Sequence, residues 1–226
     1  MTDQPSYDWM PLRTFTDRDD AGTRLGEHLA RRDDLGEPMV LGLPRGGVPV
    51  AARVARALRA PLDVIVARKV GVPFQPEVAM GAIGEGGVRY VDTKLLPRIG
   101  VTEEEFAEAE ARERIVLEER VERFRGARGR PELRGRTALI VDDGIATGAT
   151  AIAACRVARA LGASRVIVAA PVGSPQAIAQ ITDADEVVCL LKPDYLGAVG
   201  AYYRHFDQTS DAEVVELLEA ARAKHG

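Results

Sequence analysis

The sequence predicts an α/β fold in which a mostly parallel, twisted sheet is flanked by helices. Short, continuously apolar runs alternate with helical stretches in both halves of the chain, which is the pattern of parallel strands buried on both faces. The 226 residues, 46% of them hydrophobic, supply a core that needs no disulfide or metal. We expect one domain over residues 1–226, because the long charged segment in the middle is too poor in apolar residues to form a second core.

The first half of the chain begins with a loose tail of about a dozen residues and continues as helix, strand, helix, strand. Residues 19–32 carry one apolar helical stripe, and residues 48–58 form an alanine-rich helix. The apolar runs at residues 38–43 and 62–67 are predicted strands, the first of which is followed by a glycine turn. Because a helix joins these two strands, we expect them to be parallel.

The middle of the chain departs from this pattern. Residues 68–75 contain the glycine and proline of a loop, and the apolar runs at 79–83 and 88–92 flank a glycine-rich turn, which predicts a hairpin. A capping-box pattern opens a long charged helix over residues 102–125, supported by Glu–Arg pairs four residues apart. These pairs are Glu108–Arg112, Glu110–Arg114 and Glu119–Arg123.

A second series of strands and helices follows a basic, glycine-rich linker at residues 126–135. Strands are expected at residues 138–141, 165–170 and 186–191, and helices at 148–161, 175–182 and 211–224. Strands that alternate with helices in this way belong to one mostly parallel sheet with helices on both faces.

Charge and composition exclude several classes of function. The 30 Lys and Arg against 34 Asp and Glu give a net charge of −4, so no basic excess exists to bind nucleic acid. No apolar run is long enough to span a membrane, and Met1–Met10 lacks the apolar core of a secretory signal, so we expect a cytoplasmic protein. Cys155 and Cys189 have no ligand-like spacing and are expected to be reduced thiols.

The segment Ala138–Thr150 carries the strongest chemical signal. A buried strand is followed by Asp142 and Asp143 at its carboxyl end, which is where open α/β sheets bind ligands. The loop Thr147–Thr150 then starts a helix whose backbone N–H groups can hold a phosphate. Each feature alone also fits an Asp turn and a capped helix without function, but the ordered string favours a sugar-phosphate site.

The string Val-Asp-Asp-Gly-Ile-Ala-Thr-Gly-Ala-Thr resembles the phosphoribosyl pyrophosphate (PRPP) signature of the type I phosphoribosyltransferases. The resemblance implies that Asp142 and Asp143 bind the ribose hydroxyls. It assigns the 5′-phosphate to the loop residues Ala146, Thr147, Gly148, Ala149 and Thr150. The 6-oxopurine transferases of this family carry an acidic residue where this chain has Ala146, so their contact with the purine N7 is absent here.

Two further places agree with the same family. The stretch Leu-Pro-Arg-Gly-Gly after the first strand resembles the family's pyrophosphate loop, in which Arg45 offers a guanidinium fork and Gly46 and Gly47 offer backbone N–H groups. Arg68 and Lys69 stand just after the second strand, where the family places a cation that contacts pyrophosphate. The alternatives are a tight strand-to-helix turn at the glycines and two solvated basic residues.

The segment Val70–Pro76 corresponds to the family's flexible lid, which shields the reaction from water. The order of pyrophosphate loop, basic pair, lid, long insert and PRPP loop looks most like an uncharacterised bacterial subgroup of the family. The resemblance covers about residues 15–218. It implies a type I phosphoribosyltransferase-like fold with a helical insert at about 102–125 and a small hood from about 10–20 and 192–210.

Aromatic residues concentrate in the segment that would form this hood. The candidates for binding the acceptor base are Tyr195, Tyr202, Tyr203 and Phe206, with His205 beside them. An aromatic face can stack on a heterocycle. The alternative is that these side chains belong to the core, which the four-residue spacing of Tyr202 and Phe206 also permits.

The long helix carries two charged residues, Glu113 and Arg120, on its apolar face. The apolar members of that face are Phe106, Leu117, Val121 and Phe124. Either the two charges are solvated at the edge of the stripe, or they are paired at a subunit contact or over the active site.

The resemblance implies an enzyme that transfers the 5-phosphoribosyl group from PRPP to a nitrogen heterocycle such as a nucleobase and releases pyrophosphate. Its catalytic residues would be Asp142, Asp143, Arg45 and Lys69. Its cofactor would be Mg²⁺, held mainly by PRPP with Asp142 or Asp143 as a ligand. Relatives are often homodimers, which is a further expectation. Two other functions stay open: a PRPP-binding regulator without catalysis, and a hydrolase of a phosphoribosyl compound.

Overall fold

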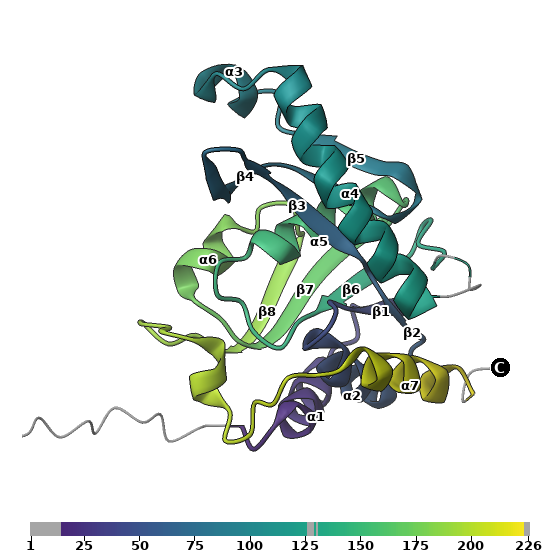
Figure 1. The fold of residues 1–226 in the computed structure, drawn as a ribbon. Coiled ribbons are helices and arrows are strands. Elements are labelled where there is room, and N and C mark those ends of the chain that lie inside the picture. The colour runs from purple at the N-terminus through teal and green to yellow at the C-terminus, as the bar shows by residue number, and fades with distance from the viewer. Residues whose placement is uncertain (1–14, 126–128, 130, 224–226) are drawn as a thin grey trace, which may run out of the picture.

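A five-stranded parallel sheet forms the centre of the molecule, with strand order β2-β1-β6-β7-β8 (Figure 1). The strands are β1 Pro38–Gly42, β2 Leu62–Val64, β6 Thr137–Val141, β7 Arg165–Val172 and β8 Glu186–Leu191. All four pairings between neighbours are parallel, which confirms the predicted sheet.

The computed structural model describes residues 15–125, 129 and 131–223. The expected N-terminal tail, the start of the 10–20 hood segment and part of the 126–135 linker lie outside these residues.

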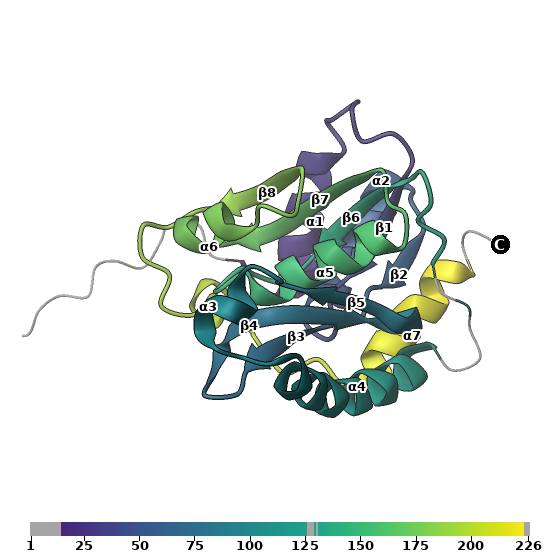
Figure 2. The ribbon, with the colours of Figure 1, turned by 90° about the horizontal axis from the view of Figure 1, so that it is seen from above.

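Helices cover both faces of the parallel sheet (Figure 2). One face carries α1 Arg18–Leu29 and α2 Gly47–Leu58, and the other carries α5 Ala149–Ala160 and α6 Pro175–Gln180. Along β1, Val40 packs into the cluster formed with α1 and α2, whereas Leu41 packs into the cluster formed with α5. Because every second side chain meets a different helix layer, the whole strand is apolar, as the continuous hydrophobic runs predicted.

A three-stranded antiparallel sheet lies against α5, with strand order β3-β4-β5. Its strands are β3 Ala67–Val72, β4 Gln75–Gly84 and β5 Val88–Val91, and the short helix η1 Glu85–Gly87 joins the last two. The predicted hairpin is therefore confirmed, with a longer first strand. The loop expected at residues 68–75 is wrong: Val70 and Val72 are buried at alternate positions of β3, and the chain reverses only around Phe74, which is 71% exposed.

The long charged helix is α4 Glu103–Arg125, and it packs on β3 and β4 on the side away from α5 (Figure 2). Its capping box is present, because the Thr102 N–H donates to Glu105 and the Glu105 N–H donates to the Thr102 hydroxyl. The expected Glu110–Arg114 pair forms at 2.5 Å. Arg123 instead pairs with Asp211, at 2.5 Å.

Three further elements complete the fold within the described part of the chain. They are α3 Leu95–Ile99, the short helix η2 Val199–Tyr202 and α7 Asp211–Arg222. The sequence reasoning missed α3, which begins where Asp92 accepts the Leu95 N–H at 2.9 Å and ends at Gly100 in the left-handed conformation.

A buried arginine at the end of α4 joins the two sheets. Arg125 is 3% exposed; its guanidinium binds the carboxylates of Glu85 and Asp63 and donates to the carbonyl oxygen of Val64 at 2.7 Å. Asp63 and Val64 belong to β2 of the parallel sheet, and Glu85 follows β4 of the antiparallel sheet. The network therefore sets how the antiparallel sheet and α4 sit on the parallel sheet.

Neither cysteine forms a disulfide, and burial raises the pKa of the Cys155 thiol to about 12. Across the described residues, no helix combines the length and the apolar character needed to cross a bilayer.

Candidate functional site

Two loops meet at the carboxyl edge of the parallel sheet, the glycine loop after β1 and the acidic loop after β6. The Leu43 N–H donates to the Val141 carbonyl at 2.9 Å, which brings the two loops together. A Cβ atom added to Gly46 would lie 2.0 Å from Oδ2 of Asp143, and one added to Gly47 would lie 2.6 Å from the Val141 carbonyl oxygen. Only glycine allows this approach.

The glycine loop differs in one respect from the sequence interpretation. The expectation was that the backbone N–H groups of both glycines are free for a diphosphate. The Gly47 N–H already donates to the Leu43 carbonyl at 3.0 Å. Because Gly46 and Gly47 have no side chains, the carboxylates of Asp143 and Asp142 can pack directly against the loop. This close packing is the structural role of the two glycines.

The two carboxylates are largely buried and lie side by side. Oδ1 of Asp142 accepts the Asp143 N–H at 2.9 Å, and Oδ2 of Asp143 accepts the Arg18 Nε–H at 2.9 Å. Removal from water, and then repulsion by Asp143, raise the pKa of Asp142. Removal from water also raises the pKa of Asp143, although Arg18 opposes this. The pair therefore forms a site that favours a ligand able to donate hydrogen bonds or to add positive charge.

Arg18 is a site residue that the sequence reasoning missed. It lies 3.9 Å from the centroid of the Phe206 ring and donates to the Asp207 carbonyl at 2.6 Å, besides binding Asp143. It therefore ties the acidic loop to the aromatic segment. The only signal in the sequence is that Arg18 opens the first helix, inside the segment expected to contribute to the hood.

The loop predicted to hold a 5′-phosphate leads directly into α5. Gly148 precedes the first residue of that helix with a φ of 77°, a left-handed conformation that suits glycine. The Thr147 hydroxyl accepts the Ala149 N–H at 3.5 Å. A cavity of about 110 Å³ lies within the loop, lined by Asp142, Gly144, Ile145, Ala146, Thr147, Gly148, Thr150 and Ala151. The cavity is therefore at the positive end of the α5 dipole.

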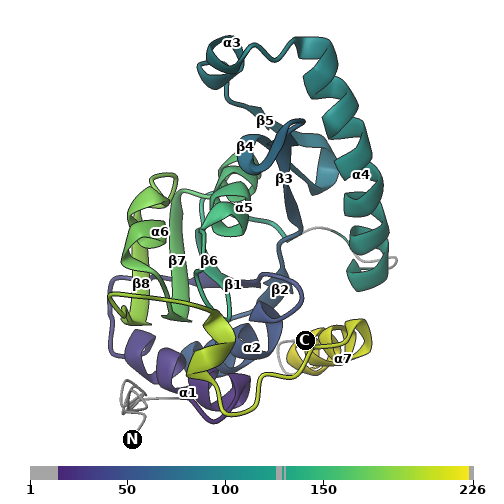
Figure 3. The same cartoon turned by 60° about the vertical axis from the view of Figure 1, so that its left-hand side comes forward.

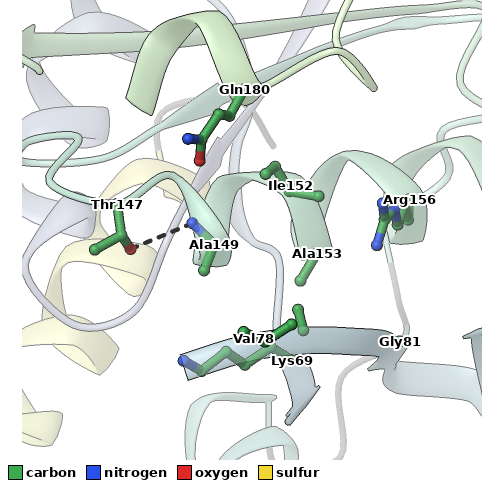
Figure 4. A pocket seen from close by; sticks show the side chains of 10 residues that line it. Lys69, Val78, Gly81, Thr147, Ala149, Ile152, Ala153, Arg156 and Gln180 are labelled. Atoms are coloured by element: carbon green, nitrogen blue, oxygen red, sulfur yellow. Dashed lines mark hydrogen bonds between the residues drawn. The ribbon is translucent and has the colours of Figure 1, made fainter. Parts of the chain in front are cut away.

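The predicted basic pair is divided between two faces of β3. Lys69 lies on the face toward α5 and lines a cavity of about 310 Å³ together with Thr147 and Ala149 (Figure 4). Arg68 lies on the opposite face and forms an ion pair with Glu113 of α4. Successive residues of a strand point to opposite sides. The two cations therefore do not act as one pair: Lys69 belongs to the phosphate-loop side, and Arg68 belongs to the α4 side.

Arg45 is exposed at the tip of the glycine loop. Its Nη1 lies 3.7 Å from Oδ1 of Asp211, the first residue of α7. The same carboxylate is bound more tightly by Arg123, at 2.5 Å. Neither Asp211 nor Arg123 was expected at the site, because each lies far from the loop in the sequence and shows no motif.

The aromatic segment lies beside the acidic loop. The Phe15 N–H donates to the Tyr202 carbonyl at 2.8 Å, so residues from both expected hood segments pair with each other. The Tyr203 hydroxyl donates to the Asp143 carbonyl at 2.5 Å, and its ring centroid lies 4.9 Å from that of Phe206. Tyr202 and Tyr203 are buried, whereas Tyr195 is 83% exposed. Burial favours the core interpretation for the first two and leaves Tyr195 and Phe206 accessible.

No group of three or more potential metal ligands from His, Cys, Asp and Glu occurs within the described residues. The two adjacent carboxylates of Asp142 and Asp143 match instead the way Mg²⁺ binds beside phosphorylated ligands, with one or two protein carboxylates and the remaining oxygens from ligand and water. The fold and the site together define an α/β protein in which an acidic loop and a glycine-rich loop meet at the carboxyl edge of a parallel sheet, with Lys69 of β3 near the start of α5.

Comparison with known proteins identifies the family. A family model of the phosphoribosyl transferase domain matches residues 19–203. Two Mycobacterium tuberculosis proteins, from strains CDC 1551 / Oshkosh and ATCC 25618 / H37Rv and each named "Putative phosphoribosyl transferase", are 53% identical over 211 residues. The match covers 93% of this chain and 47% of theirs, so the chain spans about half the length of these relatives. The chain belongs to the type I phosphoribosyltransferase family.

Two solved structures are similar to this chain. The crystal structure of TT1426 from Thermus thermophilus is 45% identical, with a TM-score of 0.85, covering 91% of this chain and 97% of that one. A Neisseria gonorrhoeae protein with bound ppGpp is 16% identical with a TM-score of 0.50, covering 92% of this chain and 95% of that one. This second likeness concerns the fold alone.

Proposed function

We propose that the protein transfers the 5-phosphoribosyl group from PRPP to a nitrogen heterocycle such as a nucleobase and releases pyrophosphate. The observation that carries this proposal is the contact of Gly46 and Gly47 with Asp143 and Asp142. That contact places a guanidinium-bearing glycine loop beside two carboxylates and the loop at the start of α5. A ribose with phosphates at both ends needs these three kinds of group next to one another.

Each group has a role in this reaction. The carboxylates of Asp142 and Asp143 accept hydrogen bonds from the ribose hydroxyls, and the loop Ala146–Thr150 binds the 5′-phosphate through backbone N–H groups. Arg45 and Lys69 face the diphosphate. The bond from ribose C1 to the diphosphate oxygen breaks and its electron pair leaves with the diphosphate. A bond from C1 to the acceptor nitrogen forms, and the proton of that nitrogen is released to solvent.

The electrostatics suit this displacement. Ribose C1 gains positive charge as the diphosphate leaves, so carboxylates near the sugar and cations near the diphosphate both lower the barrier. Holding the acceptor and C1 in line supplies a further part of the rate. The Arg18 guanidinium is paired with the Asp143 carboxylate. Ribose binding therefore either displaces the guanidinium or adds a second hydrogen-bond donor to the same carboxylate.

Mg²⁺ fits this site as a cofactor held mainly by the ligand. When bound, the ion would neutralise diphosphate charge, and Asp142 or Asp143 would hold it beside the ribose. The acceptor is expected near Tyr195 and Phe206, the two accessible aromatic residues of the 192–210 segment. Alanine at position 146 supplies no acid or base to the heterocycle.

One assay separates this function from the alternatives. The protein is incubated with PRPP, Mg²⁺ and a panel of nitrogen heterocycles, and pyrophosphate release is measured. Release that depends on the heterocycle supports the transferase. Release without it supports a hydrolase, and saturable PRPP binding without release supports a regulator.

Variants of the acidic pair test the site itself. Asp142→Asn and Asp143→Asn should each weaken PRPP binding by about tenfold or more, because charged hydrogen bonds to the ribose are lost. Asp33→Asn, an exposed carboxylate away from the site, is the matched control. Equal PRPP affinity in all three variants would contradict the proposed site.

A further inference from the structure

The helix α4 places charged side chains toward the glycine loop. Glu113 and Arg120 are seven residues apart, about two helical turns, and so share one face. Glu113 binds Arg68 of β3, and Arg123, one turn beyond Arg120, binds Asp211 of α7. Figure 3 shows the end of α4 next to α7. This part of the helix therefore faces the same region as Arg45.

The charges in this region do not balance. Three guanidinium groups, from Arg45, Arg68 and Arg123, already pair with the two carboxylates of Glu113 and Asp211. Arg120 adds a fourth positive charge to the same region. The Arg120 side chain is only partly exposed, and no carboxylate of the described residues reaches its guanidinium at ion-pair distance. Loss of water, followed by repulsion from Arg68 and Arg45, lowers the pKa of Arg120, which agrees with three cations that face one another. An anion would relieve this repulsion.

The ion pair between Arg45 and Asp211 is long enough for Arg45 to exchange its partner for a ligand. Arg45 lies 3.7 Å from Asp211, whereas Arg123 holds the same carboxylate at 2.5 Å. Arg45 can therefore turn to a ligand while Asp211 keeps a partner. Arg45 directly precedes Gly46, against which Asp143 packs, so an anion bound between Arg45 and Arg120 lies next to the proposed ribose site.

We propose that Arg120 of the long helix binds the diphosphate of PRPP and stabilises its departure, together with Arg45. The inference rests on the proposed function and assigns to the helical insert a role in that site. A guanidinium suits this task, because it stays charged and presents a planar fork to phosphate oxygens. Glu113 weakens diphosphate binding, because it is negatively charged and keeps Arg68 paired. The two charged residues on the apolar face of α4 therefore change the affinity for the diphosphate in opposite directions.

The test compares three ligands by calorimetry in the presence of Mg²⁺: PRPP, inorganic pyrophosphate and ribose 5-phosphate, which lacks the diphosphate. Arg120→Gln should weaken binding of PRPP and pyrophosphate by about tenfold or more, the loss expected for one charged hydrogen bond. Binding of ribose 5-phosphate should change less than about twofold, because the carboxylates and the 5′-phosphate loop are intact. Arg120→Lys should recover part of the loss.

Two further variants sharpen the test. Arg112→Gln removes an exposed arginine of the same helix that makes no ion pair within the described chain, and it should leave all three affinities unchanged. Glu113→Gln should strengthen pyrophosphate binding, because it releases Arg68 and removes a negative charge. Circular dichroism confirms that each variant is folded.

The outcomes are distinct. If the unchanged protein binds PRPP and Arg120→Gln binds pyrophosphate as tightly as Arg112→Gln does, the role of Arg120 is wrong while the proposed function stands. An equal loss for ribose 5-phosphate also contradicts it, because the effect would then not be confined to the diphosphate. If the unchanged protein binds neither PRPP nor ribose 5-phosphate, the proposed function fails and the role of Arg120 fails with it.

Discussion

Nε of Arg18 lies 2.9 Å from Oδ2 of Asp143, although 125 positions separate the two residues in the chain. Both side chains are largely buried, and the guanidinium also stacks on Phe206. This pair joins the first helix, the acidic loop and the aromatic segment at one point. It supplies positive charge to a carboxylate that would otherwise be costly to remove from water.

Breaking this pair should destabilise the fold. Arg18→Gln is expected to lower the free energy of unfolding by about 1–3 kcal/mol, because it leaves a largely buried carboxylate with one charged partner fewer. The measurement is urea denaturation, where the midpoint should fall without a change in slope. Arg24→Gln, which breaks an exposed pair with Asp20 on the same helix, should cost about 0.5 kcal/mol or less. Equal losses in both variants would contradict the special role of Arg18.

Stability should also depend on pH through Asp142. The folded state raises the pKa of this carboxyl above the value in the unfolded chain, so the folded state holds the proton to a higher pH. The resulting stability is present below about pH 4, the ordinary range for Asp, and is lost as the pH rises through the raised pKa.

Asp142→Asn removes this dependence, so the variant should gain in melting temperature relative to the unchanged protein as the pH rises from 4. In free energy of unfolding the gain is at most about 1.4 kcal/mol per pH unit, because a single proton is linked to folding at this carboxyl. Thermal melts at several pH values measure it, and Asp33→Asn should show a constant offset. If the gain in melting temperature of Asp142→Asn does not grow with pH, the folded state does not raise the pKa of Asp142.

The glycine loop should tolerate no side chain at position 46. Gly46→Ala puts a Cβ atom 2.0 Å from Oδ2 of Asp143, so the loop or the carboxylate must move. We expect a loss of about 1–3 kcal/mol in the free energy of unfolding and weaker PRPP binding, because the displaced carboxylate is the one assigned to ribose. Gly129→Ala is the control, since no described atom lies within 4 Å of the added carbon. Unchanged PRPP affinity in Gly46→Ala would show that the contact is not needed.

The buried arginine of α4 should matter most for stability. Arg125→Met leaves Asp63 and Glu85 without their shared cation, and breaking such a buried network costs about 3–5 kcal/mol. For a chain of this size each kcal/mol lowers the melting temperature by about 2–4 °C, which scanning calorimetry detects. Arg112→Met should change it little. A similar melting temperature for both variants would mean that the sheets hold their positions without Arg125.

The local sequence was sufficient to predict the parallel sheet and its loops. Strands buried on both faces have continuous apolar runs, and the residues of the acidic loop are adjacent in the chain, so both signals can be read without knowing any contact. The β3 strand was missed because local sequence alone does not show which strand it pairs with. Its glycine and the following proline are typical of a loop, whereas its backbone hydrogen bonds come from pairing with β4.

The composition and the local patterns of this sequence determined the α/β class and the order of most of its elements, and they are the source of the segments proposed to bind phosphate and ribose. Only the tertiary structure decided that Lys69 and Arg68 face different layers, that Tyr202 and Tyr203 are buried, and that Arg18 reaches Asp143. The physical reason is that ion pairs and burial depend on which layers pack together. That packing is the sum of many distant contacts, and no short stretch of the chain records it.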